Sequence, residues 1–109
     1  MLPNADRAVV DLAKLRDYVL SPDHARGRHK ARVFAGVLGL RPADAEWLRD
    51  RILEAVLDAP AVETITTPYG TLYQADLRLG TSSGSAVVRT AWIVRRGETF
   101  PRLTTCFVL

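Results

Sequence analysis

The stretch TLYQADLRLGTSSGSAVVRTAWIV, residues 71–94, decides the fold of this chain. Its first nine residues alternate apolar and polar side chains, which is the pattern of a strand buried on one face. Residues 80–85, GTSSGS, interrupt the alternation as a loop, and residues 86–94 form a second strand. A further turn over residues 95–101 precedes RLTTCFVL, residues 102–109, so we expect an antiparallel meander of consecutive strands.

The part of the chain before Pro60 has helical periodicity instead. We expect helices over Leu12–Leu20, Arg28–Leu38 and Ala43–Ala59, with Asp11 as the cap of the first helix. The segment AVETITT after Pro60 is rich in β-branched residues and predicts the first strand. Helices followed by strands predict an α+β fold, with about three N-terminal helices packed on one face of a four-stranded antiparallel meander sheet.

The register of the meander follows from its loops. Centring the turns near Ser82–Ser83 and Gly97–Glu98 makes one face of the sheet apolar, and a slip of one residue would mix the faces. The predicted rows on the helix-packed face are Tyr73–Trp92–Leu103, Leu77–Val88–Phe107 and Ala75–Thr90–Thr105. The opposite face is predicted to hold Gln74, Asp76, Arg78, Arg89, Arg102 and Thr104, with Asp76 and Arg89 as a cross-strand ion pair.

Composition predicts a single globular domain over residues 1–109. The chain is 48% hydrophobic and 25% charged, which argues against disorder and provides for one core. No run approaches the roughly 20 apolar residues that span a bilayer, so we expect no membrane contact. The first ten residues show no basic start followed by an apolar stretch. We therefore expect a cytoplasmic protein, or a domain that a larger machine delivers.

Metal and cofactor sites are not expected. Cys106 is the only cysteine, which excludes an internal disulfide framework and a cysteine-based zinc site in this chain. The two histidines, His24 and His29, have no neighbouring cluster of carboxylates. The sequence also has no glycine-rich phosphate loop. We therefore expect neither a metal nor another cofactor.

Charge is distributed unevenly along the chain. The net charge is +3, and Arg26–Arg32 holds four basic side chains and no acid. The segment Leu72–Leu109 contains five arginines and only two acidic residues. The segment Arg41–Glu63 contains three arginines and six acidic residues. Basic ends around an acidic middle can present one positive face, which attracts polyanions such as RNA. The alternative interpretation is a solvated basic surface without a partner.

Six short motifs occur in order along nearly the whole chain. They are Leu-Pro-Asn-Ala at Leu2–Ala5, Lys-Leu-x-x-Tyr at Lys14–Tyr18, His-x-x-Gly-x-x-Lys-Ala-x-x-Phe at His24–Phe34, Tyr-Gly at Tyr69–Gly70, Val-Arg-Thr-x-Trp-Ile at Val88–Ile93 and Pro-Arg-x-x-Thr at Pro101–Thr105. Together they resemble a bacterial domain family of unknown function that occurs in small standalone proteins and at the ends of larger ones. Ala25 departs from the family pattern, which usually has proline there. The resemblance implies membership and no settled activity.

The expected architecture also resembles the barnase–EndoU–colicin–RelE group of small ribonucleases, many of which are bacterial toxins. This resemblance implies cleavage of RNA, and for this chain the role of toxin in a toxin–antitoxin or toxin–immunity pair. Cleavage without a metal needs three groups. A base removes the ribose 2′-hydroxyl proton, cations stabilise the phosphorane, and an acid protonates the leaving 5′-oxygen.

Residues that suit this chemistry lie at the start of the second helix and in the last two strands. Arginine offers a planar fork for phosphate oxygens, and a lysine or histidine at a helix start can project over a sheet. The predicted catalytic set is Lys30, His24, Arg89, Arg102 and Thr105, and the predicted RNA- or phosphate-binding set is Arg26, Arg28, His29, Arg32 and Thr90. The expected register places both threonines on the face opposite Arg89 and Arg102, unless a bulge turns one of them.

A second function class remains open, namely a non-catalytic interaction or immunity-type module with a basic surface. A concave cluster of Lys30, Arg89 and Arg102 would favour the enzyme. A flat sheet face whose arginines are bound by Asp76 and backbone carbonyls would favour the module. The expected partners are RNA for the enzyme, and a cognate antitoxin or immunity protein for a toxin.

Overall fold

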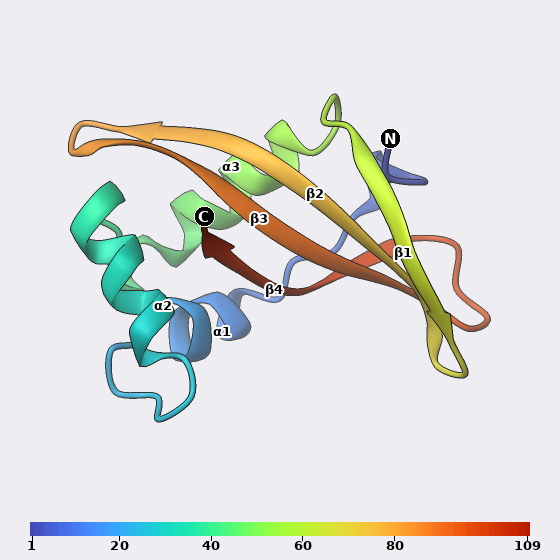
Figure 1. The fold of residues 1–109 in the computed structure, drawn as a ribbon, viewed down its shortest axis with the longest axis horizontal. Helices are drawn as coiled ribbons and strands as arrows, with labels where there is room; N and C mark the ends of the chain where they lie inside the picture. The colour runs from blue at the N-terminus through green and yellow to red at the C-terminus, as the bar shows by residue number, and fades with distance from the viewer.

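Helices precede strands along the chain, as the sequence predicts (Figure 1). The structure is a computed structural model that describes all residues 1–109. Three helices and a four-stranded antiparallel sheet confirm the α+β fold. The elements in chain order are the 3-10 turn η1 (Ala5–Arg7), α1 (Leu12–Lys14) with its π-helical continuation η2 (Leu15–Val19), α2 (Arg28–Val33) with its π-helical continuation η3 (Phe34–Leu38), the 3-10 turn η4 (Pro42–Asp44), α3 (Ala45–Ala55), β1 (Ala61–Thr67), β2 (Gly70–Thr81), β3 (Gly84–Arg95) and β4 (Pro101–Val108).

The first two helices begin and end close to their predicted bounds. Asp11 is the predicted cap of α1, and its Oδ1 accepts a hydrogen bond from the backbone N–H of Ala13 at 2.9 Å. Gly39 ends η3 with a φ of 68°, in the left-handed region that glycine adopts without strain. No helix has both the length and the apolar character that a membrane span requires.

The third helix is shorter than predicted. It ends at Ala55 rather than Ala59, and residues 56–58 form a turn. Pro60 explains the difference. Proline disfavours helical geometry in the residue before it and supplies no N–H to the carbonyl four residues earlier. Val56 remains fully buried in this turn, so the core extends beyond the helical hydrogen bonds.

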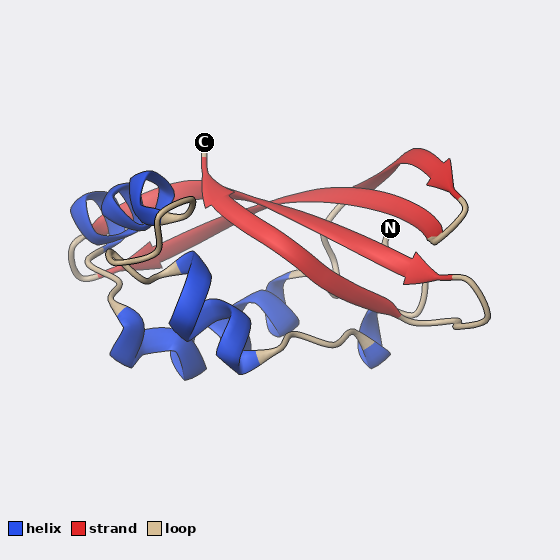
Figure 2. Cartoon of the chain, turned by 90° about the horizontal axis from the view of Figure 1, so that it is seen from below, coloured by secondary structure: helices blue, strands red, loops and turns tan.

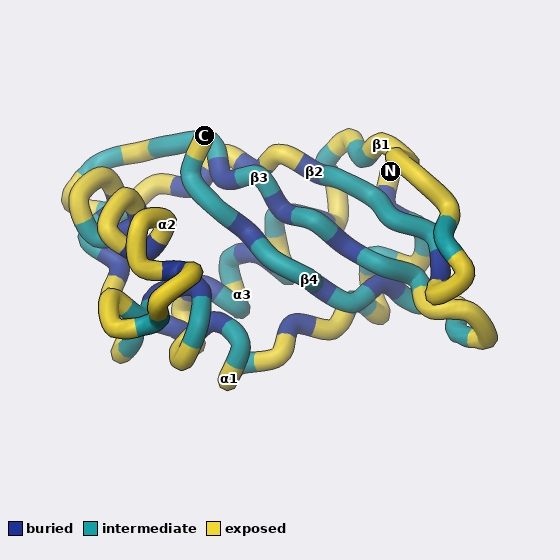
Figure 3. The backbone as a smooth tube through the Cα atoms, turned by 60° about the horizontal axis from the view of Figure 1, so that its bottom comes forward, coloured by how far each residue is buried: buried dark blue, intermediate teal, exposed yellow.

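The sheet has the strand order β1-β2-β3-β4, and most of the helical layer covers one of its faces (Figure 2). The core consists of 19 buried residues, with Trp92 of β3 and Phe34 of η3 among the most enclosed. In Figure 1, α1 and α2 lie near the C-terminal end of β4, while β1 lies on the far side of the sheet. Burial follows this arrangement: β1 is largely exposed (Figure 3).

The predicted register is confirmed for β2 and β3 and is wrong for part of β4. Tyr73, Trp92 and Leu103 form one row, as expected. A bulge then shifts the pairing, because Ala91 pairs with Thr105 while Trp92 pairs with Leu103. The inward residues beyond the bulge are therefore Cys106 opposite Thr90 and Val108 opposite Val88, in place of the predicted Thr105 and Phe107.

The bulge moves Thr105 and Phe107 to the outer face of the sheet, which they share with Arg89 and Arg102. A β-bulge adds one residue to a strand and so reverses the face of every residue beyond it. The expectation that Thr90 and Thr105 lie on the same face is thus wrong. The prediction assumed uninterrupted alternation along β4.

Candidate functional site

An open pocket lies at the β4 edge of the sheet, between the first helix and the strand. Its volume is about 520 Å³. One wall comes from the start of the first helix and the other from the bulged part of β4, so two stretches far apart in sequence meet here. The lining residues are Asp11, Ala13, Lys14, Tyr18, Thr104 and Thr105. We call this site the β4 pocket.

Helical spacing creates the first wall of the β4 pocket. Asp11, Lys14 and Tyr18 are three and four residues apart, so they form one stripe along the helix. The neighbouring stripe contains Leu15 and Val19, which are buried in the core. Burial of the apolar stripe therefore turns the polar stripe toward β4.

The two charged residues of this wall are only partly satisfied by the protein. Lys14 Nζ donates to the carbonyl oxygen of Leu103 at 3.4 Å, and it takes part in none of the five ion pairs of the structure. Asp11 uses one carboxylate oxygen to cap the helix, which leaves the other for a further partner. The pocket thus contains an unneutralised ammonium group and an available carboxylate oxygen.

The bulge creates the second wall and separates the roles of two adjacent threonines. Thr104 donates its hydroxyl to the carbonyl oxygen of Ala91 at 3.0 Å, so it stabilises the bulge. Thr105 pairs across the sheet with Ala91, whose methyl group leaves space on the outer face. The hydroxyl of Thr105 has no hydrogen-bond partner in the protein, and neither has that of Tyr18. Both remain free to bind a ligand.

His24 holds the loop that leads from the first helix to α2. Its Nδ1 accepts from the backbone N–H groups of Arg26 and Gly27 at 3.2 and 3.3 Å. Its ring packs edge-on against Tyr18, with 4.3 Å between centroids. A Cβ at Gly27 would approach the Tyr18 carbonyl oxygen to 2.7 Å, so only glycine allows the loop to lie so close. His24 therefore positions Tyr18, with its Nδ1 as the hydrogen-bond acceptor that holds the loop.

α2 brings basic side chains to the same edge. Lys30 Nζ lies 4.6 Å from the centroid of the Phe107 ring, a cation–π contact. Phe107 is two residues beyond Thr105 on the outer face, about 7 Å along the strand. Lys30 thus lies past one end of the β4 pocket and is not among its lining residues. The other basic residues of this segment, Arg26, Arg28, His29 and Arg32, are exposed and form no ion pair.

The two arginines of the predicted catalytic set are each bound by a carboxylate. Arg89 donates to both oxygens of Asp76 at 2.9 and 3.0 Å, which confirms the predicted cross-strand pair. Arg102 donates to both oxygens of Glu98 at 2.9 Å and lies over the Phe100 ring. The hydrogen bonds from the two guanidinium groups lower the pKa of Asp76 and of Glu98.

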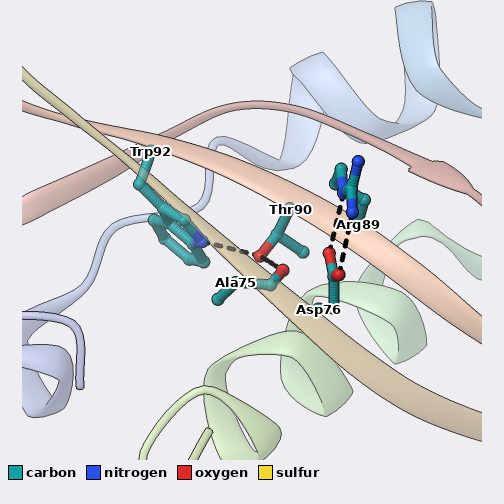
Figure 4. Close-up of polar contacts among 5 residues, drawn as sticks. All are labelled: Ala75, Asp76, Arg89, Thr90 and Trp92. Atoms are coloured by element: carbon teal, nitrogen blue, oxygen red, sulfur yellow. Dashed lines mark hydrogen bonds and ion pairs between the residues drawn. The ribbon is translucent and has the colours of Figure 1, made fainter. Parts of the chain in front are cut away.

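Thr90 is part of the core rather than of a surface site. It is fully buried, donates to the Ala75 carbonyl oxygen at 2.6 Å and accepts from Trp92 Nε1 at 2.7 Å (Figure 4). Figure 4 also shows the Asp76–Arg89 pair beside it. Cys106, opposite Thr90, is buried as well, and burial raises the pKa of its thiol to about 12.

The structure brings together part of the predicted site. Thr105 lines the β4 pocket, and Lys30 lies near it. Arg89 pairs with Phe107 on the neighbouring strand, and the His24 ring packs against the Tyr18 ring. Arg102 is five residues from Phe107 along β4, roughly 16 Å away at the rise of a strand. Sequence analysis missed Asp11, Lys14 and Tyr18 as site residues. Their signal was the polar stripe beside the apolar stripe of the first helix. No group of three or more His, Cys, Asp or Glu side chains is arranged to hold a metal ion.

Comparison with known proteins gives one match. Neither a curated protein nor a solved structure matches the chain. The model of one family, described as Domain of unknown function (DUF6883), matches residues 1–109, which is the whole chain. The chain therefore belongs to the DUF6883 family.

Proposed function

We propose that this domain is a metal-independent endoribonuclease and that the β4 pocket is its active site. One observation carries the proposal: the ammonium of Lys14, the carboxylate of Asp11 and the free hydroxyls of Tyr18 and Thr105 line one open pocket. Lys30 adds a second cation beside it. Free hydroxyl donors beside cations that form no ion pair suit the binding of a phosphate group.

The proposed reaction is an intramolecular transphosphorylation. The ribose 2′-oxygen attacks the adjacent phosphorus, and the bond from phosphorus to the 5′-oxygen breaks. The products are a 2′,3′-cyclic phosphate and a 5′-hydroxyl, so the step consumes neither water nor a cofactor. Asp11 accepts the 2′-hydroxyl proton with its free oxygen, and Tyr18 donates a proton to the leaving 5′-oxygen.

Charge develops on the phosphorane, and the two lysines are placed to neutralise it. Lys14 and Lys30 approach the β4 pocket from α1 and α2, so they would flank a bound phosphate. Thr105 would donate a hydrogen bond to a nonbridging oxygen. Donors held in place before the reaction stabilise the transition state more than donors that must reorganise. His24 serves as a positioning residue for Tyr18 in this scheme.

RNA would reach the pocket along the basic surface of α2. Arg26, Arg28 and Arg32 are exposed and unpaired, so they are available to contact the phosphates on either side of the cleaved bond. By its resemblance to small ribonuclease toxins, the domain would act as the toxin of a toxin–antitoxin or toxin–immunity pair. Its neutralising partner would then carry acidic groups that cover this same surface.

The test is an assay of purified protein on mixed-sequence RNA in the presence of a chelator. We expect cleavage that leaves 2′,3′-cyclic phosphate and 5′-hydroxyl ends. The same oligonucleotide with 2′-deoxyribose throughout should bind and stay intact, because it lacks the nucleophile. Tyr18→Phe and Thr105→Val should each slow cleavage, and their melting temperatures should stay close to that of the wild type because both hydroxyls lack protein partners.

Three results would contradict the proposal. Wild-type protein that leaves RNA intact in chelator would remove the activity itself. Cleavage that survives both hydroxyl substitutions unchanged would place the active site elsewhere. Cleavage of the 2′-deoxy strand would exclude the transphosphorylation chemistry and point to hydrolysis.

A non-catalytic interaction module is the second candidate function. The observation that favours it is that Arg89 and Arg102 are each bound bidentately by a carboxylate, which reduces their availability for phosphate. Such a module would bind its partner through the outer sheet face and leave RNA intact. Tight binding of RNA or protein without cleavage would favour this function over the enzyme.

A further inference from the structure

The two edges of the sheet differ in how they are covered. At β4, Val9 pairs in parallel with Arg102, and its backbone bonds to Pro101 and Leu103 are 2.9 Å long. At the other edge, β1 pairs only with β2, and no strand or helix lies against its outer side. A strand with a free edge offers a row of backbone donors and acceptors to another strand.

β1 also exposes apolar side chains on one face. Val62 is 62% exposed and Ile65 is 58% exposed, although strands of seven residues usually bury such side chains. A bulge between Glu63 and Ile65 brings the two onto the same face, because Val62 pairs with Gln74 and Ile65 with Leu72. The edge therefore combines open hydrogen-bonding groups with an apolar pair.

The two ends of β1 carry opposite charges. Arg95 and Arg96 lie at the Thr67 end, where the N–H of Arg96 donates to the Tyr69 carbonyl oxygen at 2.9 Å. Both arginines line an open pocket with Thr67 and Glu98, and the Glu98 carboxylate is bound by Arg102, so this end has a net positive charge. Neither Arg95 nor Arg96 forms an ion pair. Asp58 precedes the other end of the strand and is exposed and unpaired.

We propose that β1 pairs antiparallel with β1 of a second copy of this chain, which joins the two sheets into one continuous sheet. Antiparallel pairing about a two-fold axis places the arginine end of one copy beside the acidic end of the other, twice. The same axis near Thr64 gathers Val62 and Ile65 of both copies into one apolar cluster. Parallel pairing would bring like charges together, so the charges select the antiparallel dimer.

An interface of one short strand on each side is small, below about 1,200 Å² of total buried area, and interfaces of that size are weak. We therefore expect a dissociation constant on the order of 10 μM. The dimer leaves the β4 pocket open, because β4 lies at the opposite edge of each sheet. This inference is independent of the proposed ribonuclease activity.

The test is sedimentation velocity of the full chain over a concentration series from about 1 μM to 1 mM, which brackets the expected constant. Ile65→Lys should weaken dimerisation more than about tenfold, because it places a charge in the apolar cluster. Val37→Lys is the matched control, since Val37 is an exposed valine on η3, far from β1 in the fold. Both side chains are exposed, so both variants should melt near the wild-type temperature.

A charge swap tests the orientation of the pairing. Asp58→Arg and Arg96→Glu should each weaken the dimer, and the double variant should recover most of the loss by restoring opposite charges across the axis. A monomer at all concentrations would overturn the proposal. So would a dimer that is indifferent to Ile65→Lys, or a chain that stays monomeric and pairs through β1 with a strand of another protein.

Discussion

The two edge strands of this sheet differ in whether another segment binds their outer backbone groups. β4 is covered by Val9 and the first helix, and its bulge holds Thr104 and Thr105 against a pocket. β1 is uncovered and lacks a buried residue, and its own bulge only aligns two exposed apolar side chains. One extra residue in a strand thus contributes to an open pocket at one edge and to an exposed apolar pair at the other.

The difference shows that the surroundings of a bulge decide what it does. At β4 the neighbouring helix supplies Lys14 and Tyr18, so Thr105, which the bulge moves to the outer face, lies beside polar groups. At β1 no helix packs on the strand, so Val62 and Ile65 are exposed to solvent. The proposed chemistry therefore belongs to the covered edge, and proposed self-association belongs to the open edge.

The largest effect is expected at the β4 edge. Lys14→Ala should slow RNA cleavage by about a hundredfold or more, because it removes a cation that stabilises the phosphorane. Arg96→Ala is the matched control, since it removes an exposed, unpaired cation near β1. It should leave the cleavage rate within about twofold of wild type. Equal losses in both variants would mean that net positive charge, rather than the pocket, governs the rate.

A second substitution compares a buried threonine with an exposed one. Thr90→Val should lower the free energy of unfolding by roughly 2–3 kcal/mol, because the Trp92 indole N–H and the Ala75 carbonyl lose a buried partner. Thr66→Val, on β1, should change it by less than about 0.5 kcal/mol, because Thr66 is exposed. Urea unfolding measures both. A Thr90→Val protein as stable as wild type would refute the structural role of this hydroxyl.

The basic surface of α2 is expected to give a smaller effect, visible in salt dependence. The double variant Arg28→Gln with Arg32→Gln should bind 2′-deoxy oligonucleotide less tightly. Its plot of log affinity against log salt should be shallower by about 1.4, which is 0.7 for each lost phosphate contact. The control, Arg49→Gln with Arg51→Gln, removes two arginines that are already paired with acids on α3. An unchanged slope in the α2 variant would exclude α2 from the binding surface.

The smallest effect is expected for the paired arginines. The sequence predicts Arg102 as a catalytic residue that holds phosphate, but its bidentate ion pair with Glu98 argues for a structural role. Arg102→Ala should therefore slow cleavage by less than about threefold, since it removes no direct transition-state contact. A loss of about a hundredfold in a folded variant would restore Arg102 to the active site.

The ion pairs also predict a pH dependence of stability. Arg89 lowers the pKa of Asp76 below its ordinary value of 3.8, chiefly through the side-chain hydrogen bonds. A depressed carboxylate pKa stabilises the folded state above the unfolded pKa, and this stability is lost as pH falls through the folded-state pKa. Asp76→Asn should thus melt slightly below wild type at neutral pH, and the difference should shrink as the pH falls below the ordinary pKa of 3.8 toward the lowered folded-state pKa. A difference that grows in acid would contradict the assignment.

Most of the fold could be predicted because alternation, helical periodicity and capping residues each lie within a single helix or strand. The alternation in β2 predicted the pairing with β3, and Asp11 marked the start of the first helix correctly. The third helix was predicted too long because apolar spacing continued to Ala59, although Pro60 had already restricted the residues before it.

The site was harder to predict because it depends on a bulge and on contacts between distant segments. Leu103 and Cys106 are buried three residues apart, an odd spacing that an unbroken strand does not allow. The sequence alone does not show this spacing, because Phe107 and Val108 beside Cys106 are apolar as well and fit an unbroken alternation equally. The approach of Lys14 to β4 had no sequence signal either, because helix packing rather than sequence separation brings the two together.

The most direct test of the central claim maps where RNA binds. Backbone amide shifts of the ¹⁵N-labelled protein should be followed as an uncleavable 2′-deoxy oligonucleotide is added. If the β4 pocket is the active site, the largest shifts will fall on residues 11–18, on the start of α2 and on residues 103–107. Shifts concentrated on β1 or around Arg102 and Glu98, or no shifts at low salt, would contradict the account.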